Sequence, residues 1–252
     1  MRTVVVGASS GLGRSIAIGL AQRGAQVAML ARRKERLDAA VEEAGDTTFA
    51  IECDVTDDAS CRSAVETAVA TLGGIDALVY APAIGPLSRL ADLDTQTWRK
   101  VLDTNVIGAA QMTAAAIPHL RTSGGTAMFL SSVSASLTPP WPGLGAYIVS
   151  KAALDKLVEA WRVEEAGVGF TRLVVGDCAG GEGDSQTEFA NGWDTDLAVE
   201  LGTGWMTRGY LAGSLIAIDE LVAMVDSVLR GGASLSVPSI TVYPRPPVPE
   251  QA

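Results

Sequence analysis

The sequence is poor in the residues that build several common kinds of site. It contains one histidine, His119, so a Ser/His/Asp triad would depend on that single residue, which follows Pro118 near the end of a predicted helix. Its three cysteines, Cys53, Cys61 and Cys178, lack the spacing of metal ligands, and we expect them to be reduced and to bind no metal. No apolar run reaches about 18 residues and no signal-peptide pattern opens the chain, so we expect a cytoplasmic protein that does not span a membrane.

Positive charge is scarce as well. The 19 Lys and Arg residues against 29 Asp and Glu residues leave a formal net charge of −10, which argues against nucleic acid or an anionic membrane as a partner. No linker rich in proline, glycine or serine divides the 252 residues, and 48% of them are hydrophobic. We therefore expect one domain over residues 1–252 with a large core, ending in a proline-rich surface tail at residues 244–252.

Short apolar runs alternate with helical patterns along the chain. The predicted strands are residues 3–6, 26–31, 47–53, 75–80, 126–130, 170–175 and 237–243, and the predicted helices are residues 14–23, 33–44, 56–72, 94–121, 147–166 and 219–230. Because the strands are apolar on both faces, they predict a parallel sheet that is covered on both sides. Right-handed crossovers then predict a single-domain α/β Rossmann fold, with a doubly wound seven-stranded parallel sheet and helices on both faces.

A glycine-rich turn joins the first predicted strand to the first predicted helix. It reads Gly7-Ala8-Ser9-Ser10-Gly11-Leu12-Gly13. Glycines at such a turn let the backbone approach a pyrophosphate, whose negative charge is stabilised by the N-terminus of the helix. The turn therefore predicts a dinucleotide-binding site.

The end of the second predicted strand bears on which dinucleotide binds. In NAD-selective proteins of this fold, an Asp or Glu near that place binds the ribose 2′-hydroxyl. Here Ala31 is followed by Arg32 and Arg33, so no carboxylate repels a 2′-phosphate, and we expect Arg32, with Arg33 as a second candidate, to bind one bidentately. The sequence therefore favours NADP. Asp54, after the third predicted strand, is a candidate to accept a hydrogen bond from an adenine amino group.

Tyr147 and Lys151 lie four residues apart at the start of a predicted helix, which puts both side chains on one face. A phenol has a pKa near 10, and proton transfer near pH 7 needs that pKa to be lowered. We expect the ammonium and the positive end of the helix dipole to lower it.

Ser132 lies at the end of the fifth predicted strand. It therefore faces the crevice that this fold forms at the carboxyl edge of its sheet. Asn105, inside the long predicted helix, is a candidate to hold a water or to kink that helix.

These residues resemble the motifs of the short-chain dehydrogenase/reductase family, of the Tyr-x-x-x-Lys type. The resemblance covers nearly the whole chain and includes, in the family's order and spacing, residues 7–13, Cys53-Asp54-Val55, Asn105-Val-Ile-Gly108, Ser131-Ser132-Val133 and Tyr147-x-x-x-Lys151. It implies an NADP(H)-dependent oxidoreductase acting on a ketone or secondary alcohol. The coenzyme-binding residues that follow from the motifs are Gly7, Ser9, Ser10, Gly11, Leu12, Gly13, Arg32, Arg33, Asp54, Val55, Ala81, Tyr147 and Lys151.

The resemblance also implies catalytic roles. Tyr147 would be the general acid in ketone reduction and the base in alcohol oxidation, while Lys151 would lower the pKa of the phenol and bind the nicotinamide ribose. Ser132 would hydrogen-bond the substrate oxygen; Ser134 is a second candidate, because the interval from Ser132 to Tyr147 is longer than in many members. Asn105 would hold a water in a proton relay near the lysine.

Two departures from the family pattern keep an alternative open. Tyr80-Ala81-Pro82-Ala83 stands where the family usually has Asn-Asn-Ala-Gly, and Gly176-Asp177 stands where it usually has Pro-Gly. The alternative is a catalytically silent NAD(P)-binding sensor or scaffold protein of the same fold. A sugar-nucleotide epimerase would need a larger C-terminal substrate domain than this chain can hold.

The substrate and the assembly are less sharply defined by the sequence. We expect an irregular, glycine-rich substrate lid over residues 176–212 and a small-molecule carbonyl or alcohol substrate of apolar character. Four side chains either line an apolar pocket there or pack in the core: Trp141, Trp193, Trp205 and Met206. The family resemblance implies a homodimer or a homotetramer.

Overall fold

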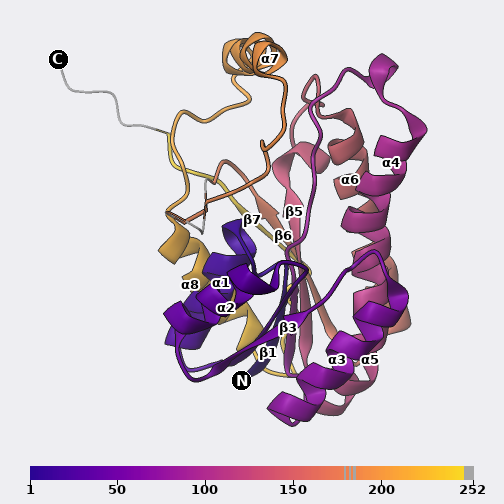
Figure 1. The fold of residues 1–252 in the computed structure, drawn as a ribbon, viewed down its shortest axis with the longest axis vertical. Helices are drawn as coiled ribbons and strands as arrows, with labels where there is room; N and C mark the ends of the chain where they lie inside the picture. The colour runs from indigo at the N-terminus through magenta and orange to yellow at the C-terminus, as the bar shows by residue number, and fades with distance from the viewer. Residues whose placement is uncertain (179, 182, 184–185, 247–252) are drawn as a thin grey trace, which may run out of the picture.

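A parallel sheet runs through the centre of the molecule (Figure 1). The computed structural model describes residues 1–178, 180–181, 183 and 186–246. In that part of the chain the sheet has seven strands in the order β3-β2-β1-β4-β5-β6-β7, and every neighbouring pair is parallel. The strands are β1 (Arg2–Val6), β2 (Gln26–Ala31), β3 (Thr48–Glu52), β4 (Ala77–Tyr80), β5 (Thr126–Ser132), β6 (Gly169–Val175) and β7 (Ser239–Val242). The predicted doubly wound fold is confirmed.

Valine-rich runs form the central strands, because branched side chains suit a pleated sheet that is buried on both faces. In β1, Val4, Val5 and Val6 are all fully buried. Successive residues serve different cores: Val4 and Val6 pack with Leu78 on one face of the sheet, and Val5 packs with Met29 on the other. The apolar runs in the sequence therefore reflect two cores separated by one sheet.

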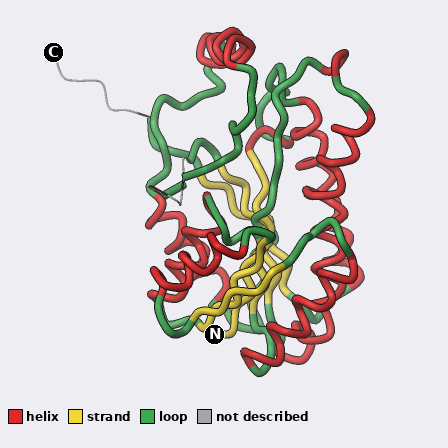
Figure 2. Tube along the Cα trace, in the orientation of Figure 1, coloured by secondary structure: helices red, strands yellow, loops and turns green. Residues whose placement is uncertain are grey.

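Helices cover both faces of the sheet (Figures 1 and 2). One layer contains α1 (Gly11–Gln22), α2 (Lys34–Ala44) and α8 (Ile218–Leu229), and the other contains α3 (Asp58–Leu72), α4 (Thr95–Leu102), α5 (Gly108–Ser123) and α6 (Gly145–Glu164). Short 3₁₀ turns, η1 (Leu90–Asp92) and η3 (Val133–Ala135), follow β4 and β5. The strand order reverses between β1 and β4, which opens a crevice at the carboxyl ends of the strands. Among the helices described, none combines the length and hydropathy needed to cross a bilayer.

The helix predicted over residues 94–121 is interrupted. It begins as α4, passes through a π-helical segment, η2 (Asp103–Ile107), and continues as α5. The segment contains Asn105, which is fully buried, and Thr104, whose carbonyl accepts a hydrogen bond from the Tyr80 hydroxyl at 2.5 Å. Groups that bond to a helix from outside its own ladder are a recognised cause of such breaks, and π segments often occur at functional sites.

The predicted lid over residues 176–212 contains more regular structure than we expected. Its second half forms a helix, α7 (Thr195–Thr207), which lies at the end of the molecule away from the N-terminus (Figure 1). Asp194 caps this helix by accepting a hydrogen bond from Leu197 N at 2.8 Å, and Leu201 and Trp205 bury one face of it. Residues 179, 182 and 184–185 of the predicted lid, and residues 247–252 of the predicted tail, lie outside the described residues.

Candidate active site

A groove of about 540 Å³ follows the carboxyl ends of the strands from the glycine-rich turn to Tyr147. Its walls include almost all of the residues that the sequence singled out: Gly7, Ser9, Ser10, Gly11, Leu12, Gly13, Arg32, Arg33, Asp54, Val55, Ala81, Ser132, Ser134, Tyr147 and Lys151. Asn105 is the exception, because it is fully buried behind the groove. The groove collects these residues because parallel strands present their carboxyl ends at one edge of the sheet.

The glycine-rich turn requires glycine for steric reasons. Gly7 and Gly11 have φ angles of +80° and +56°, a backbone region that other residues rarely adopt. A Cβ atom on Gly13 would lie 2.4 Å from the carbonyl oxygen of Gly7, closer than any real contact. The turn thus brings the start of α1 directly against the end of β1. Backbone N–H groups at that helix N-terminus are suited to bind an anion.

Arg33, rather than Arg32, contacts the glycine-rich turn. Its Nη2 donates to Ser9 Oγ at 2.9 Å and to Ser10 Oγ at 2.8 Å. Arg32 is exposed on the wall of the groove near Asp54. Burial acts to raise the pKa of Asp54, but hydrogen bonds from Thr56 and the charge of Arg32 outweigh it and lower that pKa. The two arginines therefore serve different parts of the groove.

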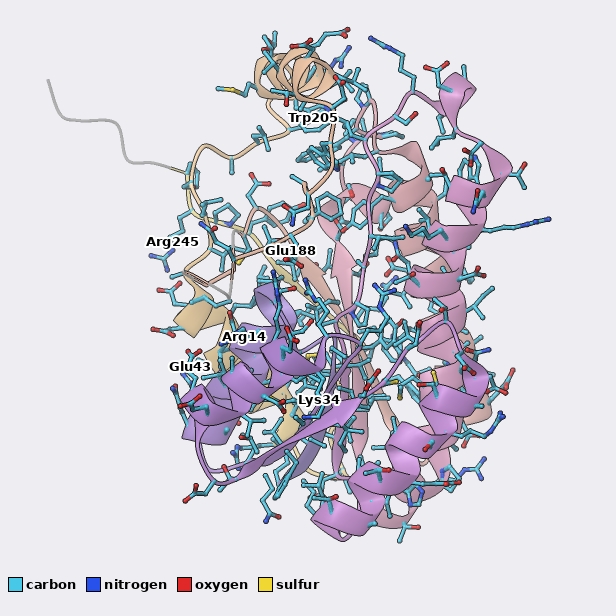
Figure 3. All side chains as sticks on the ribbon, in the orientation of Figure 1. Arg14, Lys34, Glu43, Glu188, Trp205 and Arg245 are labelled. Atoms are coloured by element: carbon cyan, nitrogen blue, oxygen red, sulfur yellow. The ribbon has the colours of Figure 1, made fainter. Side chains whose placement is uncertain are left out.

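Residues 186–189, which belong to the predicted lid, cross this groove, although no single residue among them was a predicted site residue. Glu188 forms salt bridges with Arg33 and with Arg36, the latter at 2.5 Å, and lies beside the start of α1 in Figure 3. The next residue, Phe189, packs edge-on against Tyr147 with 4.8 Å between the ring centroids. Arg36 could have been found from its position one turn after Arg33, whereas no local pattern marks Glu188.

Tyr147 and Lys151 share one face of α6, but their pKa values differ from our expectation. Burial raises the pKa of Tyr147 to about 12, with a smaller opposing effect from the Ser132 hydroxyl. Burial also lowers the pKa of Lys151 to about 8, opposed by the charge of Asp155. The prediction of a phenol acidified by its neighbouring ammonium is wrong for this structure.

The position of the ammonium explains part of that difference. Lys151 Nζ lies 5.7 Å from the centre of the Tyr147 ring and donates to the carbonyl oxygen of Leu130 at 2.6 Å. Spacing along a helix puts the two side chains on one face, but it does not determine which acceptor the ammonium selects. The edge-on ring of Phe189 meanwhile helps to keep water from the phenol.

Ser132 and Ser134 lie side by side on the wall of the groove. Their hydroxyl oxygens are 2.9 Å apart, and Ser134 N donates to Ser132 Oγ at 3.2 Å. Ser134 is almost fully buried, whereas Ser132 is partly exposed and acts on the pKa of Tyr147. Ser132 therefore presents the more accessible hydroxyl to the groove, and Ser134 contacts that hydroxyl through both its own hydroxyl and its backbone N–H.

Asn105 uses its side chain to hold a loop. Its Oδ1 accepts from Ile84 N and its Nδ2 donates to Ile84 O, both at 2.9 Å. The other Nδ2 hydrogen goes to Ser150 Oγ, also at 2.9 Å, and Ser150 in turn donates to Tyr147 O at 2.6 Å. Asn105 therefore fixes both the loop after β4 and the first turn of α6.

Aromatic side chains form a separate apolar cluster next to the groove. Trp141 packs on Trp205 with ring centroids 5.4 Å apart and on Tyr210 at 5.7 Å, and it also lines the groove. Trp193 meets Trp205 at 6.2 Å and donates to Gly85 O at 2.8 Å. Of the four side chains proposed for an apolar pocket, Met206 is 69% exposed and is not part of this cluster. Trp205 is marked beneath α7 in Figure 3.

Comparison with known proteins places these features in a family. The model of the short chain dehydrogenase family matches residues 2–182. The chain is 37% identical over 169 residues to 11-beta-hydroxysteroid dehydrogenase 1A of Arabidopsis thaliana, a match that covers 65% of this chain and 48% of that protein. It is 35% identical over 168 residues to dehydrogenase/reductase SDR family member 4 of Oryctolagus cuniculus, covering 65% of this chain and 64% of that protein. The chain thus matches about half the length of its plant relatives.

Solved structures share the fold over nearly the full length. An alcohol dehydrogenase from Thermococcus sibiricus complexed with 5-hydroxy-NADP superposes with a TM-score of 0.78 at 23% identity, covering 98% of each chain. A 3-ketoacyl-(acyl-carrier-protein) reductase from Brucella melitensis complexed with NADH gives a TM-score of 0.79 at 23% identity, covering 95% of each chain. These identities bear on the fold alone. Since the family model matches most of the sequence, this chain belongs to the short-chain dehydrogenase/reductase family of oxidoreductases.

Proposed function

We propose that this chain is an NADP(H)-dependent oxidoreductase that interconverts a ketone and a secondary alcohol, with Tyr147 as general acid and base. The observation that carries the proposal is the groove itself. At one end it has a glycine-rich turn and the guanidinium of Arg33, and at the other it has Tyr147, Lys151 and Ser132. A coenzyme-binding end and a proton-transfer end thus share one cavity.

The residues of the groove fit a nicotinamide dinucleotide. A Cβ on Gly13 would collide with the Gly7 carbonyl. Because glycine has no Cβ, the turn stays tight and its backbone can approach a pyrophosphate. Ala31 ends β2 without a carboxylate, and Arg33 with Ser9 offers a charged donor set to a ribose 2′-phosphate. Asp54 and Val55 line the part of the groove that would hold the adenine, and Ala81 lies beside the turn.

Tyr147 would hold the proton that the reaction needs. When bound, the nicotinamide supplies or accepts a hydride. A phenol with a pKa of about 12 is protonated at neutral pH, so Tyr147 is ready to give a proton to a carbonyl oxygen. Ser132 would donate a hydrogen bond to that oxygen, while Lys151 would contact the nicotinamide ribose. The resting protonation state therefore suits carbonyl reduction.

Asn105 supports this site by positioning. Three hydrogen bonds to Ile84 and Ser150 occupy its amide group, so a relay water near Lys151 would depend on the remaining lone pair of Oδ1 or on backbone carbonyls of η2. We propose that Asn105 holds the groove in shape and that any such water lies beside it.

The substrate we propose is an apolar ketone or alcohol. Trp141 and Leu144 belong to the aromatic cluster and also line the groove near Tyr147. Relatives named as 11-beta-hydroxysteroid dehydrogenases agree with a bulky apolar substrate class. We also propose a cytoplasmic location and assembly as a homodimer or homotetramer. For the assembly, Val149 and Val163 on α6 are 49% and 83% exposed and offer apolar side chains to an interface. Sedimentation of the purified chain measures that assembly directly.

Consumption of NADPH with a panel of ketones and aldehydes tests the reaction. Tyr147→Phe should abolish turnover and leave NADPH binding nearly intact, whereas Tyr243→Phe, which removes the hydroxyl of an exposed tyrosine, should retain turnover. A chain that binds NADPH but consumes none with any carbonyl would instead be the silent sensor or scaffold. Full activity in Tyr147→Phe would refute the assigned chemistry.

Coenzyme choice is tested by direct binding. Arg33→Ala should weaken NADPH far more than NADH, because only NADPH carries the 2′-phosphate. Arg32→Ala is the matched comparison, since Arg32 lies on the same wall without contacting Ser9 or Ser10. Equal losses for both coenzymes in Arg33→Ala would remove the argument for NADP.

A further inference from the structure

Two arginines and two serines converge at the end of the groove that is closest to α2. Arg33 donates to Ser9 and Ser10 from β1–α1, and Arg36 lies one helical turn further along α2. Guanidinium groups with hydroxyl groups are the donors that most often bind a phosphate monoester, through charged and bidentate hydrogen bonds. The cluster is therefore a built anion site, formed by two separate elements.

A carboxylate of the chain itself fills that site. Glu188 pairs with Arg33 through Oε2 and with Arg36 through Oε1 at 2.5 Å, and the Ser10 hydroxyl donates to Oε2 at 3.3 Å. The Glu188 side chain is 27% exposed. Burial acts to raise the pKa of Glu188, but hydrogen bonds from the two arginines outweigh it and lower that pKa. The group is thus anionic at neutral pH and uses the donors that a phosphate would use.

The backbone beside Glu188 also occupies a hydrogen-bond donor of the glycine-rich turn. Gln186 O accepts a hydrogen bond from Gly11 N at 3.1 Å, and Thr187 Cα lies 3.5 Å from the place of a Cβ on Gly11. Gly11 N is the first amide of α1, in the region where a pyrophosphate would bind. Residues 186–188 therefore satisfy anion-binding groups with their own acceptors at two adjacent places.

We infer that Glu188 is a specificity-determining residue, which competes with the 2′-phosphate of NADP(H) for Arg33 and Arg36 and so lowers the preference for NADP(H) over NAD(H). The inference rests on the proposed coenzyme-binding groove. In this fold the residue that selects the coenzyme usually lies at the end of β2. Glu188 is far from β2 in the sequence, but its salt bridge with Arg33 brings it to the same place.

The size of the effect follows from the competition. An apparent dissociation constant rises in inverse proportion to the population that is able to bind. If Glu188 holds the arginines in about nine molecules of ten, NADPH binding is weakened about tenfold. NADH lacks the 2′-phosphate and gains no ion pair when Glu188 leaves, so its binding changes much less. The ratio of the two dissociation constants is therefore the quantity to measure.

Isothermal titration of NADPH and NADH, without substrate, tests the inference on the full chain. Glu188→Gln keeps the shape of the side chain and removes its charge, so the preference for NADPH over NADH should increase about tenfold. Glu200→Gln is the matched control, because it removes the same charge from the nearby helix α7 and breaks the exposed pair with Arg89 at 2.6 Å. That control should leave the ratio unchanged.

A second pair of variants shows whether the effect passes through the arginine. In an Arg33→Ala background, Glu188→Gln should change the ratio far less than it does in the wild-type chain. Adenosine 2′-monophosphate, compared with adenosine 5′-monophosphate, should show the same dependence on Glu188 as NADPH does. Agreement of both results supports direct competition at the 2′-phosphate.

The outcomes separate the two proposals. If Glu188→Gln leaves the ratio unchanged, or tightens both coenzymes equally, the inference about Glu188 is overturned. In that case the proposed function still stands if the wild-type chain binds NADPH and Arg33→Ala weakens it selectively. If neither the wild-type chain nor Glu188→Gln binds either coenzyme, the proposed function fails and the inference fails with it.

Discussion

Replacement of Asn105 by alanine tests how much the groove depends on one buried amide. The change removes the partners of Ile84 N, Ile84 O and Ser150 Oγ, which each lie 2.9 Å from the amide. Ser150 keeps its hydrogen bond to Tyr147 O, so the two backbone groups of Ile84 bear most of the loss. A buried polar group left without a partner costs about 1–3 kcal/mol, less where water can reach it.

Because Ile84 is partly exposed, we place the total loss for Asn105→Ala near the lower end, at about 2–4 kcal/mol. For a chain of this size, each kcal/mol corresponds to about 2–4 °C in Tm, so the midpoint should fall by roughly 4–16 °C. Circular dichroism during heating, together with urea unfolding at 25 °C, measures both quantities. NADPH binding should weaken as well, since Ile84 lines the groove.

Gln111→Ala is the matched control for that experiment. Gln111 also carries a buried amide oxygen in α5, but that oxygen has no hydrogen-bond partner among the described residues. Its removal deletes the same chemical group without orphaning a backbone amide. If Asn105→Ala and Gln111→Ala unfold at the same temperature, the argument that Asn105 anchors the loop after β4 is wrong.

Other predictions concern ionisation and the glycine-rich turn. Because the unfolded chain holds a proton on Lys151 that the folded chain releases above pH about 8, wild-type stability measured by urea unfolding should rise from pH 8 to pH 10 relative to Lys151→Met, by up to about 3 kcal/mol. Phe189→Ala should lower the pKa of Tyr147 from about 12 toward 10, seen in the phenolate absorbance after subtraction of a Tyr147→Phe spectrum. Gly13→Ala should lower Tm and abolish coenzyme binding, whereas its control Gly202→Ala, with open space around it in α7, should leave Tm equal or higher. The absence of an effect of pH, of Phe189→Ala or of Gly13→Ala would contradict the contact behind that prediction.

Much of the fold could be predicted because the order of apolar and polar residues in the sequence matches the faces that are buried in the structure. Strands such as β1 are apolar on both faces, which occurs where a parallel sheet is covered on both sides. The helix predicted over residues 56–72 is present as α3, and Asp57 caps it by accepting a hydrogen bond from Ala59 N at 2.8 Å. The α7 helix was missed because Gly202 and Gly204 lower its helix propensity, although Leu197, Leu201 and Trp205 repeat every four residues.

The candidate site was predictable to the extent that topology determines it. Asp54, Ser132 and the glycine-rich turn follow strands whose carboxyl ends meet, so the fold alone brings them to one groove. Glu188 could not be found in this way, because its partners lie about 150 positions earlier and no repeat or motif links them. The sequence favoured Arg32, the first residue after Ala31, for the 2′-phosphate, whereas in the structure Arg33 is the arginine that donates to Ser9 and Ser10.

The protonation of the Tyr147 and Lys151 pair shows why neighbours in a helix are not enough to predict chemistry. Counting charges at the four-residue spacing predicts an acidified phenol, but burial moves both groups toward their neutral forms, Tyr147 to about 12 and Lys151 to about 8. Both shifts have one cause, burial in the fold, and for Tyr147 the covering residues include Phe189, which is distant in sequence. At pH 7 the pair then carries its full complement of protons, which is the state from which a proton can be given to a carbonyl oxygen. A pKa of this kind belongs to the folded groove rather than to the motif, so any change that readmits water to the phenol should shift it.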